Sequence, residues 1–323
     1  MRVVSGVKPS GKMHVGNYLG AVKRFIEFQN SAEESFIFVA DYHVLNTYPD
    51  PAHLKESTMD ILLDYLALGL DPEKTTLFLQ SSVPEVTELT FLLSNYTPMG
   101  LLERAHAYKD ALAKEKNINH GMFTYPVLMA ADILAYHADF VPVGRDQKQH
   151  IEITRDIAMR FNNRFGDILT VPEPYIEESM AVIPGTDGRK MSKSYGNTIE
   201  IFNTPKKMKK QVMNIVTDST PMEEPLDAES CNVFALYRFF ATPEECREMK
   251  KKYASSTFGY GHAKLALFEK MNEYFTPFRE KREELKRDEE KVREILRRGG
   301  EKARREAQKT VSEIRRAVGI VEI

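Results

Sequence analysis

The chain has 323 residues, a length that favours two domains. Its 45 Lys and Arg nearly balance its 47 Asp and Glu, and its 42% hydrophobic residues can close a sizeable core, which excludes a disordered, fibrous or strongly basic protein. Two cysteines exclude a disulfide framework, and there is no signal peptide and no apolar run of roughly 18 residues. We therefore expect a cytoplasmic protein without a membrane partner.

The first half of the chain alternates short apolar runs with helical periodicity. Strands are predicted at Arg2–Val7, Ser35–Val39, Thr75–Leu79 and Phe140–Val143, and helices at Asn17–Gln29, Pro51–Leu70 and Asp146–Phe161. Residues 86–137 are predicted to be mostly helical, with a polar loop at Lys109–His120. Apolar strands separated by helices indicate an α/β fold whose parallel sheet is covered on both faces and binds ligands at the carboxyl ends of its strands.

The second half shows helical periodicity and no strand pattern. Thr204-Pro205 can open a helix and marks a domain boundary, and the pair Gly299-Gly300 is predicted to separate Arg279–Arg298 from a last helix, Glu301–Val318. We therefore expect an α/β domain over 1–203 with a helical insertion around 86–137. A helical domain over 204–300 and a C-terminal helix within 301–323 that packs back on the body should follow.

The turn between the first strand and the first helix carries the first motif. It reads Pro-Ser-Gly-Lys-Met-His-Val-Gly-Asn over residues 9–17. Glycine lets phosphates approach the backbone, a helix N-terminus offers N–H donors, and His14 can donate a hydrogen bond or carry charge in a phosphoryl transition state. Read alone, the motif is as compatible with an ordinary turn, and its spacing fits neither a Rossmann fingerprint nor a P-loop.

The second motif is the basic stretch Arg-Lys-Met-Ser-Lys-Ser-Tyr-Gly-Asn over residues 189–197. Two lysines between small hydroxyl residues suit a loop that closes on a polyphosphate, where lysine is a mobile point charge for a leaving pyrophosphate. The alternative for so short a stretch is an exposed basic loop.

A third pattern lies in the helical insertion. Tyr125, Met129 and Asp132 are spaced at i, i+4 and i+7 and share one helix face. They describe an apolar pocket with one hydrogen-bond acceptor, which matches an indole because an indole has one N–H donor and no acceptor. Spacing alone equally allows Tyr125 and Met129 to be core residues while Asp132 caps a neighbour.

Together the two loop motifs resemble the paired signatures of class I aminoacyl-tRNA synthetases, His-Ile-Gly-His and Lys-Met-Ser-Lys-Ser. Here the first reads His-Val-Gly-Asn over 14–17, and the second is intact over 190–194. Asp132 and the segment Val-Pro-Val-Gly-Arg-Asp-Gln-Lys-Gln-His-Ile-Glu over 141–152 look like bacterial tryptophanyl-tRNA synthetases. This resemblance extends from Met1 to about Val318.

The resemblance implies a Rossmann-like nucleotide-binding domain and an all-helical anticodon-binding domain. It implies that tryptophan is activated with ATP and Mg²⁺ to an adenylate and transferred to tRNA(Trp). It also implies a cytoplasmic homodimer with no protein-bound metal. The apolar stretch Leu89–Leu102 is predicted to be buried across the two-fold axis or, alternatively, in the internal core. The surplus of positive charge after residue 203, in Lys206–Lys210, Lys250–Lys252 and Arg279–Arg298, is predicted to face the tRNA. The aromatic residues among these runs, Tyr253, Phe258, Tyr260 and Tyr274, are predicted to face its bases.

The resemblance also implies roles for individual residues. Asp132 receives the indole N–H, Gln147 contacts the amino group with a neighbouring tyrosine, and residues 144–146 bind the ATP ribose. The tryptophan-binding set is Val4, His43, Tyr125, Met129, Asp132, Val141, Val143 and Gln147. The ATP-binding set is Lys8, Pro9, Ser10, Gly16, Asn17, Gly144, Arg145, Asp146, Ile183, Lys190, Met191, Ser192, Lys193 and Ser194. His14, Lys190 and Lys193 are implied to be catalytic, helped by Lys109 or Lys114.

Three positions depart from the family pattern. Arg145 replaces a commonly acidic residue, Lys8 stands where Gln is frequent, and Val4 stands where an aromatic residue is frequent. The alternatives are a tyrosyl-tRNA synthetase, a nucleotidyltransferase that adenylates a small phosphate ester, and a non-catalytic paralogue that binds tRNA or tryptophan. An intact second motif argues against the paralogue, and the helical second half argues against the nucleotidyltransferase.

Overall fold

The computed structural model describes residues 1–114, 118–144, 147–176 and 183–321. Within these ranges one parallel sheet has the strand order β3-β2-β1-β4-β5. Its strands are β1 (Arg2–Val7), β2 (Glu34–Val39), β3 (Thr76–Leu79), β4 (Phe140–Pro142) and β5 (Glu173–Tyr175). The first four confirm the predicted strands to within one residue at each end. The three-residue β5 was not predicted because it is short, contains a proline and is mostly exposed.

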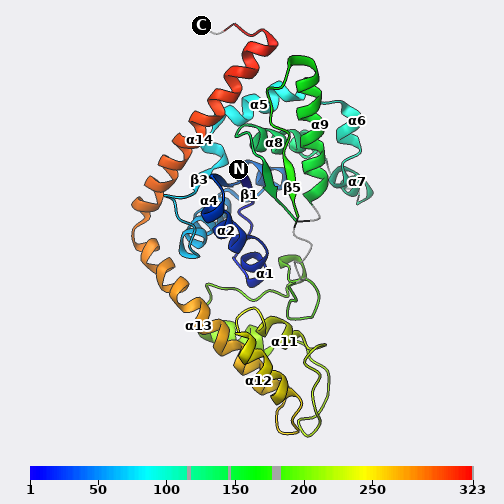
Figure 1. The fold of residues 1–323 in the computed structure, drawn as a ribbon, viewed down its shortest axis with the longest axis vertical. Helices are drawn as coiled ribbons and strands as arrows, with labels where there is room; N and C mark the ends of the chain where they lie inside the picture. Colours follow the sequence, from blue (N-terminus) through cyan, green and yellow to red (C-terminus); the bar gives the residue numbers. More distant parts are fainter. Residues whose placement is uncertain (115–117, 145–146, 177–182, 322–323) are drawn as a thin grey trace.

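Helices cover the sheet and form the second half (Figure 1). Before residue 200 they are α1 (Val15–Asn17), the π-helix η1 (Tyr18–Val22), α2 (Lys23–Ser31), α3 (Asp41–Val44), α4 (Pro51–Ala67), α5 (Pro84–Ser94), α6 (Met99–Glu103), α7 (His106–Ala113), α8 (His120–Leu134) and α9 (Lys148–Phe165). Short 3₁₀ turns are η2 (Leu45–Thr47), η3 (Gln80–Ser82) and η5 (Lys193–Tyr195). The second half contains α10 (Pro205–Met213), α11 (Asn232–Tyr237), α12 (Pro243–Tyr253), α13 (Tyr260–Arg287) and α14 (Glu289–Val318). The predicted polar loop at 109–120 is thus helical up to Ala113.

Strand β2 separates two hydrophobic cores because its side chains alternate between the faces of the sheet. Ile37 and Val39 join the first core, with α4, the second motif and the helices α10–α13. Phe36 and Phe38 join the second core, with α5, α6, α8, α9 and part of α14. Each core therefore supports a different part of the sheet's carboxyl edge.

The second core also explains the apolar stretch over 89–102. Leu89, Leu93 and Leu102 are buried within this chain, whereas Phe91 and Met99 are exposed. Internal packing therefore accounts for most of the apolar character that could have indicated a dimer interface.

Helix α14 runs along the sheet and covers the edge strand β3 (Figure 1). It passes through Gly299 and Gly300 without a break, so the helix boundary predicted there is wrong; α13 and α14 instead meet at Asp288. A Cβ atom on Gly299 would lie 1.9 Å from the carbonyl oxygen of Leu77 in β3. The glycine permits close packing of helix on strand, which is why it does not end the helix.

Contacts from α13 tie the helical second half to the α/β part. Arg282 of α13 donates to Asp64 at 2.5 Å and to Asp60 at 2.6 Å, both on α4. The hydroxyls of Tyr274 on α13 and Tyr18 on η1 are 2.6 Å apart. Helix α10 begins at Pro205 as predicted, with Thr204 as its N-cap. No helix in the described ranges is long and apolar enough to cross a membrane.

Candidate active site

A cavity of about 430 Å³ opens at the carboxyl ends of β1 and β4. The strand order reverses between these two strands, the usual position of a ligand site in an open α/β sheet. All eight residues of the predicted tryptophan-binding set line it: Val4, His43, Tyr125, Met129, Asp132, Val141, Val143 and Gln147. Lys8 and Gly144 of the predicted ATP set line it as well. Tyr125, Met129 and Asp132 all point from helix α8 into this cavity, as their spacing predicted.

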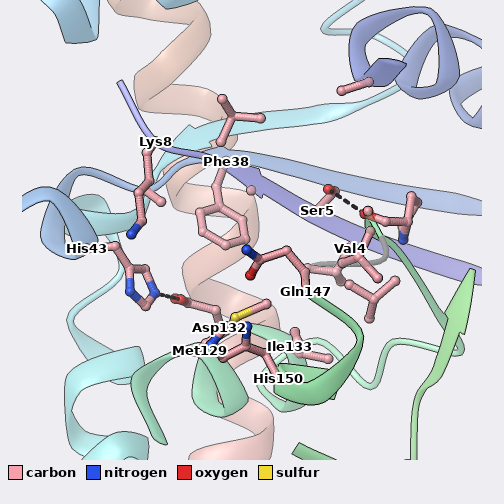
Figure 2. A pocket seen from close by; sticks show the side chains of 18 of the residues that line it. Val4, Ser5, Lys8, Phe38, His43, Met129, Asp132, Ile133, Gln147 and His150 are labelled. Carbon is pink, nitrogen blue, oxygen red and sulfur yellow. Dashed lines mark hydrogen bonds and ion pairs between the residues drawn. The ribbon is translucent and has the colours of Figure 1, made fainter. Parts of the chain in front are cut away.

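The polar end of the cavity is the Asp132 carboxylate, which is 2% exposed. His43 at the carboxyl end of β2 donates from Nε2 to Oδ2 of Asp132 at 2.8 Å (Figure 2). Gln80, directly after β3, donates from Nε2 to both carboxylate oxygens, at 2.9 and 2.8 Å. Burial raises the pKa of Asp132, and the hydrogen bonds from His43 and Gln80 oppose that rise. Gln80 was missed by the sequence analysis.

Phe38 forms an aromatic wall of the cavity (Figure 2). Its ring lies against Gly6 so closely that a Cβ atom there would be 2.4 Å from Cζ of Phe38. Gly6 on β1 therefore makes room for the ring from the neighbouring strand β2. Phe38 supplies an aromatic surface beside Val4, the position where the family pattern often has an aromatic residue.

Tyr125, His150 and Lys8 also line the cavity. The hydroxyl of Tyr125 and Nε2 of His150 are 2.5 Å apart, and burial raises the pKa of Tyr125 to about 12. The ammonium of Lys8 lies 5.8 Å from the centre of the Tyr125 ring, and desolvation lowers its pKa. In Figure 2 the Lys8 and Gln147 side chains reach toward the space above Asp132. Arg145 and Asp146 lie outside the described residues.

The second motif packs onto the first beyond the carboxyl end of β1. The backbone N–H of Gly16 is 3.2 Å from the sulfur of Met191, which is buried, and the ammonium of Lys193 donates to the carbonyl of Ser10. The backbone N–H of Met191 donates to the carbonyl of Ile183 at 2.8 Å. Segments 175 residues apart in the sequence thus lie side by side.

Asn197 holds the second motif in shape. It is 2% exposed, accepts from the backbone N–H of Ser192 at 2.8 Å, and donates to the carbonyl of Lys190 at 3.1 Å and to Asp187 at 2.6 Å. The hydroxyls of Ser192 and Ser194 are 2.8 Å apart. The sequence analysis did not predict this structural role for Asn197, the last residue of the second motif.

His14 is the N-cap of α1. Its Nδ1 accepts from the backbone N–H of Asn17 at 3.3 Å, so Nε2 is the nitrogen that carries the proton in the neutral ring. Burial, with the positive charge of Lys193, lowers the pKa of His14 to about 4. The imidazole is therefore a neutral hydrogen-bond donor at neutral pH and does not carry charge in the free protein.

The remaining predicted residues lie outside the cavity wall. Pro9 and Ser10 follow β1, while Lys190, Lys193 and Ser194 are exposed on the loop. Lys109 on α7 and Lys114 after it are both exposed, and neither lines the cavity. Among the described residues, no group of three or more His, Cys, Asp or Glu side chains is placed to hold a metal ion. We call the surroundings of Asp132 the cavity end of the site, and His14, Gly16 and residues 190–194 the loop end.

Known proteins share this arrangement over the whole chain. The family model for tRNA synthetases class I (W and Y) matches residues 1–276. Tryptophan–tRNA ligases of Fusobacterium nucleatum and Rhodopirellula baltica are 54% and 52% identical, covering 99% of this chain and 98% and 100% of theirs. The crystal structure of tryptophanyl-tRNA synthetase from Campylobacter jejuni complexed with ADP and tryptophan is 48% identical, with a TM-score of 0.95 over 99% of this chain and 100% of that one. The chain therefore belongs to the bacterial tryptophan–tRNA ligases, within the class I aminoacyl-tRNA synthetases.

Proposed function

We propose that the cavity binds L-tryptophan and that the adjoining loop end binds ATP, so that the protein forms tryptophanyl-adenylate and then tryptophanyl-tRNA(Trp). The observation that carries this proposal is a buried carboxylate in an apolar cavity at the end of β1, together with an intact Lys-Met-Ser-Lys-Ser loop that packs on the turn following the same strand.

The cavity end suits an indole better than a phenol. Phe38, Val4 and Val141 offer flat and branched apolar surfaces, and Asp132 offers an acceptor for the indole N–H. A phenol hydroxyl also accepts a hydrogen bond, so it needs a donor beside Asp132. The two nearest donors, on His43 and Gln80, already point at the carboxylate. Tyrosine would leave its oxygen unsatisfied, which disfavours the tyrosyl alternative.

Adenylation needs no nucleophile from the protein, because the substrate carboxylate is one. A carboxylate oxygen bonds to the α-phosphorus while the bond to the β-phosphate oxygen breaks, and pyrophosphate leaves with its electron pair. Lys190 and Lys193 are exposed on the loop, and Lys193 donates to the Ser10 carbonyl; we propose that both lysines stabilise the developing charge. Neutral His14 would donate from Nε2 to a phosphate oxygen. Catalysis is then positioning and charge stabilisation.

The proposal includes the partners implied by the family. Mg²⁺ would arrive with ATP, and tRNA(Trp) would bring its 3′ end to the cavity while its anticodon meets the helical second half. The exposed lysines of α10 support this path. Tyr253 is buried and Tyr274 is hydrogen-bonded to Tyr18, so these aromatic residues do not face bases as predicted. We further propose that the protein acts in the cytoplasm as a homodimer.

Amino-acid-dependent exchange of pyrophosphate into ATP, measured with each of the twenty amino acids, tests the function. Tryptophan should support exchange far better than any other amino acid. Faster exchange with tyrosine would establish the tyrosyl alternative. Binding of tryptophan or tRNA without exchange would establish the non-catalytic one.

A further inference from the structure

Gln80 is a buried polar residue that the mechanism above does not use. It begins η3 at the carboxyl end of β3, is 1% exposed and does not line the cavity. Both ends of its amide are nevertheless engaged. The Nε2 group faces Asp132, and Oε1 accepts from the backbone N–H of Tyr42 at 3.1 Å.

The bond from Tyr42 fixes which way the amide points. A flipped amide would set its NH₂ group against the Tyr42 N–H and its oxygen against the Asp132 carboxylate. Gln80 would then lose its hydrogen bonds to both residues. The loops around it are also fixed, because Asp41 accepts from the backbone N–H of Ser81 at 3.0 Å. The ends of β2 and β3 are thereby linked in both directions.

We propose that Gln80 is a positioning residue for tryptophan recognition, which orients the Asp132 carboxylate so that it presents a free lone pair to the indole N–H. This inference rests on the proposed function, because it takes Asp132 as the acceptor. Gln80 holds both oxygens from one side, while His43 holds Oδ2 from another. The carboxylate therefore keeps one orientation before the substrate arrives, and its charged form is favoured against burial.

The direct test replaces the amide by an apolar group of the same length, Gln80→Met. The probes are L-tryptophan and L-3-(benzothiophen-3-yl)alanine, in which sulfur replaces the indole N–H. We expect the ratio of kcat/KM for tryptophan over this analogue to fall about 10- to 100-fold, the range for hydrogen bonds to a charged group. The fall should lie in the KM for tryptophan, while kcat and the KM for ATP change little.

A second buried glutamine provides the matched control. Gln29 is 8% exposed, donates to the carbonyl of Gly69 at 3.0 Å and accepts from the backbone N–H of Asp71 at 2.8 Å, away from the cavity. Gln29→Met should lower the melting temperature and leave the ratio of the two substrates unchanged. An equal fall of the ratio in both variants would overturn the inference, since it would report general loosening of the fold.

The variant Asp132→Ala separates this inference from the proposed function. If Asp132→Ala keeps the wild-type ratio, the carboxylate is not the indole acceptor and that part of the proposed function fails. If Asp132→Ala abolishes the preference while Gln80→Met retains it, only the positioning inference fails. In the double variant, Gln80→Met should have no further effect on the ratio.

The variant Gln80→Glu decides the matter if Gln80→Met does not fold. A carboxylate at residue 80 repels Asp132 when ionised and donates to it when protonated, so tryptophan should bind more tightly as the pH falls from about 8 to 6. In the wild type this rise in affinity should be absent, because the residue 80 amide does not titrate and a proton on Asp132 removes the charge of the indole acceptor. The same trend in both proteins would overturn the inference.

Discussion

The cavity end and the loop end of the site are built in opposite ways. At the cavity end, Asp132, His43 and Gln80 are buried, His43 and Gln80 both hydrogen-bond to the Asp132 carboxylate, and the second core lies behind them. At the loop end, Lys190 and Lys193 are exposed, and the first core reaches them through Met191 alone of the residues 190–194.

This difference matches two tasks of the adenylation step, the selection of the amino acid and the stabilisation of the leaving pyrophosphate. Selecting one amino acid requires an acceptor whose place is fixed before binding, because an unpaired buried group then penalises the wrong substrate. Stabilising charge that appears only as pyrophosphate leaves requires cations that can follow it. A preorganised cavity and an exposed cationic loop can therefore coexist on one sheet edge because separate cores support them.

The largest effect should come from the loop end. Lys193→Ala removes a cation from the developing charge and should lower kcat for pyrophosphate exchange about 100- to 1000-fold, with a smaller change in the KM for ATP. Lys74→Ala, which removes an exposed lysine bonded only to Asn30 among the described contacts, is the control and should retain activity. A change confined to the KM for ATP would show that Lys193 binds the ground state.

The next effect concerns the support under the loop end, where Arg282 pairs with buried Asp64. Burial raises the pKa of Asp64 to about 6 despite Arg282, so Asp64 is ionised above that pH. Arg282→Met leaves this charge uncompensated and raises its pKa further, which should cost about 3–5 kcal/mol of unfolding free energy at pH 8.

The loss of unfolding free energy in Arg282→Met should become smaller as the pH falls. Without Arg282 the pKa of Asp64 lies above its wild-type value of about 6, so the folded variant takes up this proton well before the unfolded chain does and should regain stability as the pH falls from 8 to 5.5. Urea unfolding at the two pH values measures it. An equal loss at both pH values would mean that Arg282 acts by packing against Phe202, its cation–π partner at 5.2 Å.

A smaller effect is expected from lysines that contact tRNA but neither end of the active site. Reversing the charge of the exposed lysines 206, 207, 209 and 210 on α10 should lower aminoacylation about tenfold at low salt, because each phosphate contact contributes to the salt dependence of binding. Tryptophan-dependent pyrophosphate exchange should stay intact. A parallel fall in exchange would assign these lysines to the fold or to the loop end.

The smallest effect should arise at the wall of the cavity. Phe38→Leu removes an aromatic surface and should raise the KM for tryptophan about three- to tenfold, the worth of one aromatic contact. Phe78, whose ring lies 5.7 Å from Phe38 but does not line the cavity, gives the control Phe78→Leu. An equal rise of the KM in both variants would remove Phe38 from the binding surface.

Sequence patterns predicted the first four strands, but not β5, and the residues on one helix face, because these features depend on local periodicity. Tyr125, Met129 and Asp132 needed only the helical repeat to be placed together. Gln80 is a polar residue directly after a buried strand, which marks it as a candidate in the sequence. Its contact with Asp132 could be recognised only once β3 was known to lie beside β2. Phe38 was missed for a related reason, since its exposure to the cavity depends on Gly6 of another strand.

Two predictions failed because a residue type has more than one use. Gly299 and Gly300 were taken as a helix end, whereas the contact with Leu77 shows that Gly299 serves tertiary packing. Tyr253 was taken as a surface for bases, yet it is 1% exposed and packs against Phe234. The local sequence does not show whether a glycine ends a helix or packs against a strand, or whether a tyrosine is exposed or buried. Both depend on the residues that pack against it in the fold.

The covering of β3 by α14 also bears on how the chain is made. The unpaired side of an edge strand invites other chains to add to it, and proteins commonly block it. Here β3 ends at Leu79 and the blocking helix begins only at Glu289, so β3 lacks its cover while residues 80–288 are synthesised. We expect nascent chains and C-terminal truncations to be more prone to aggregate than the finished protein, and to depend more on chaperones.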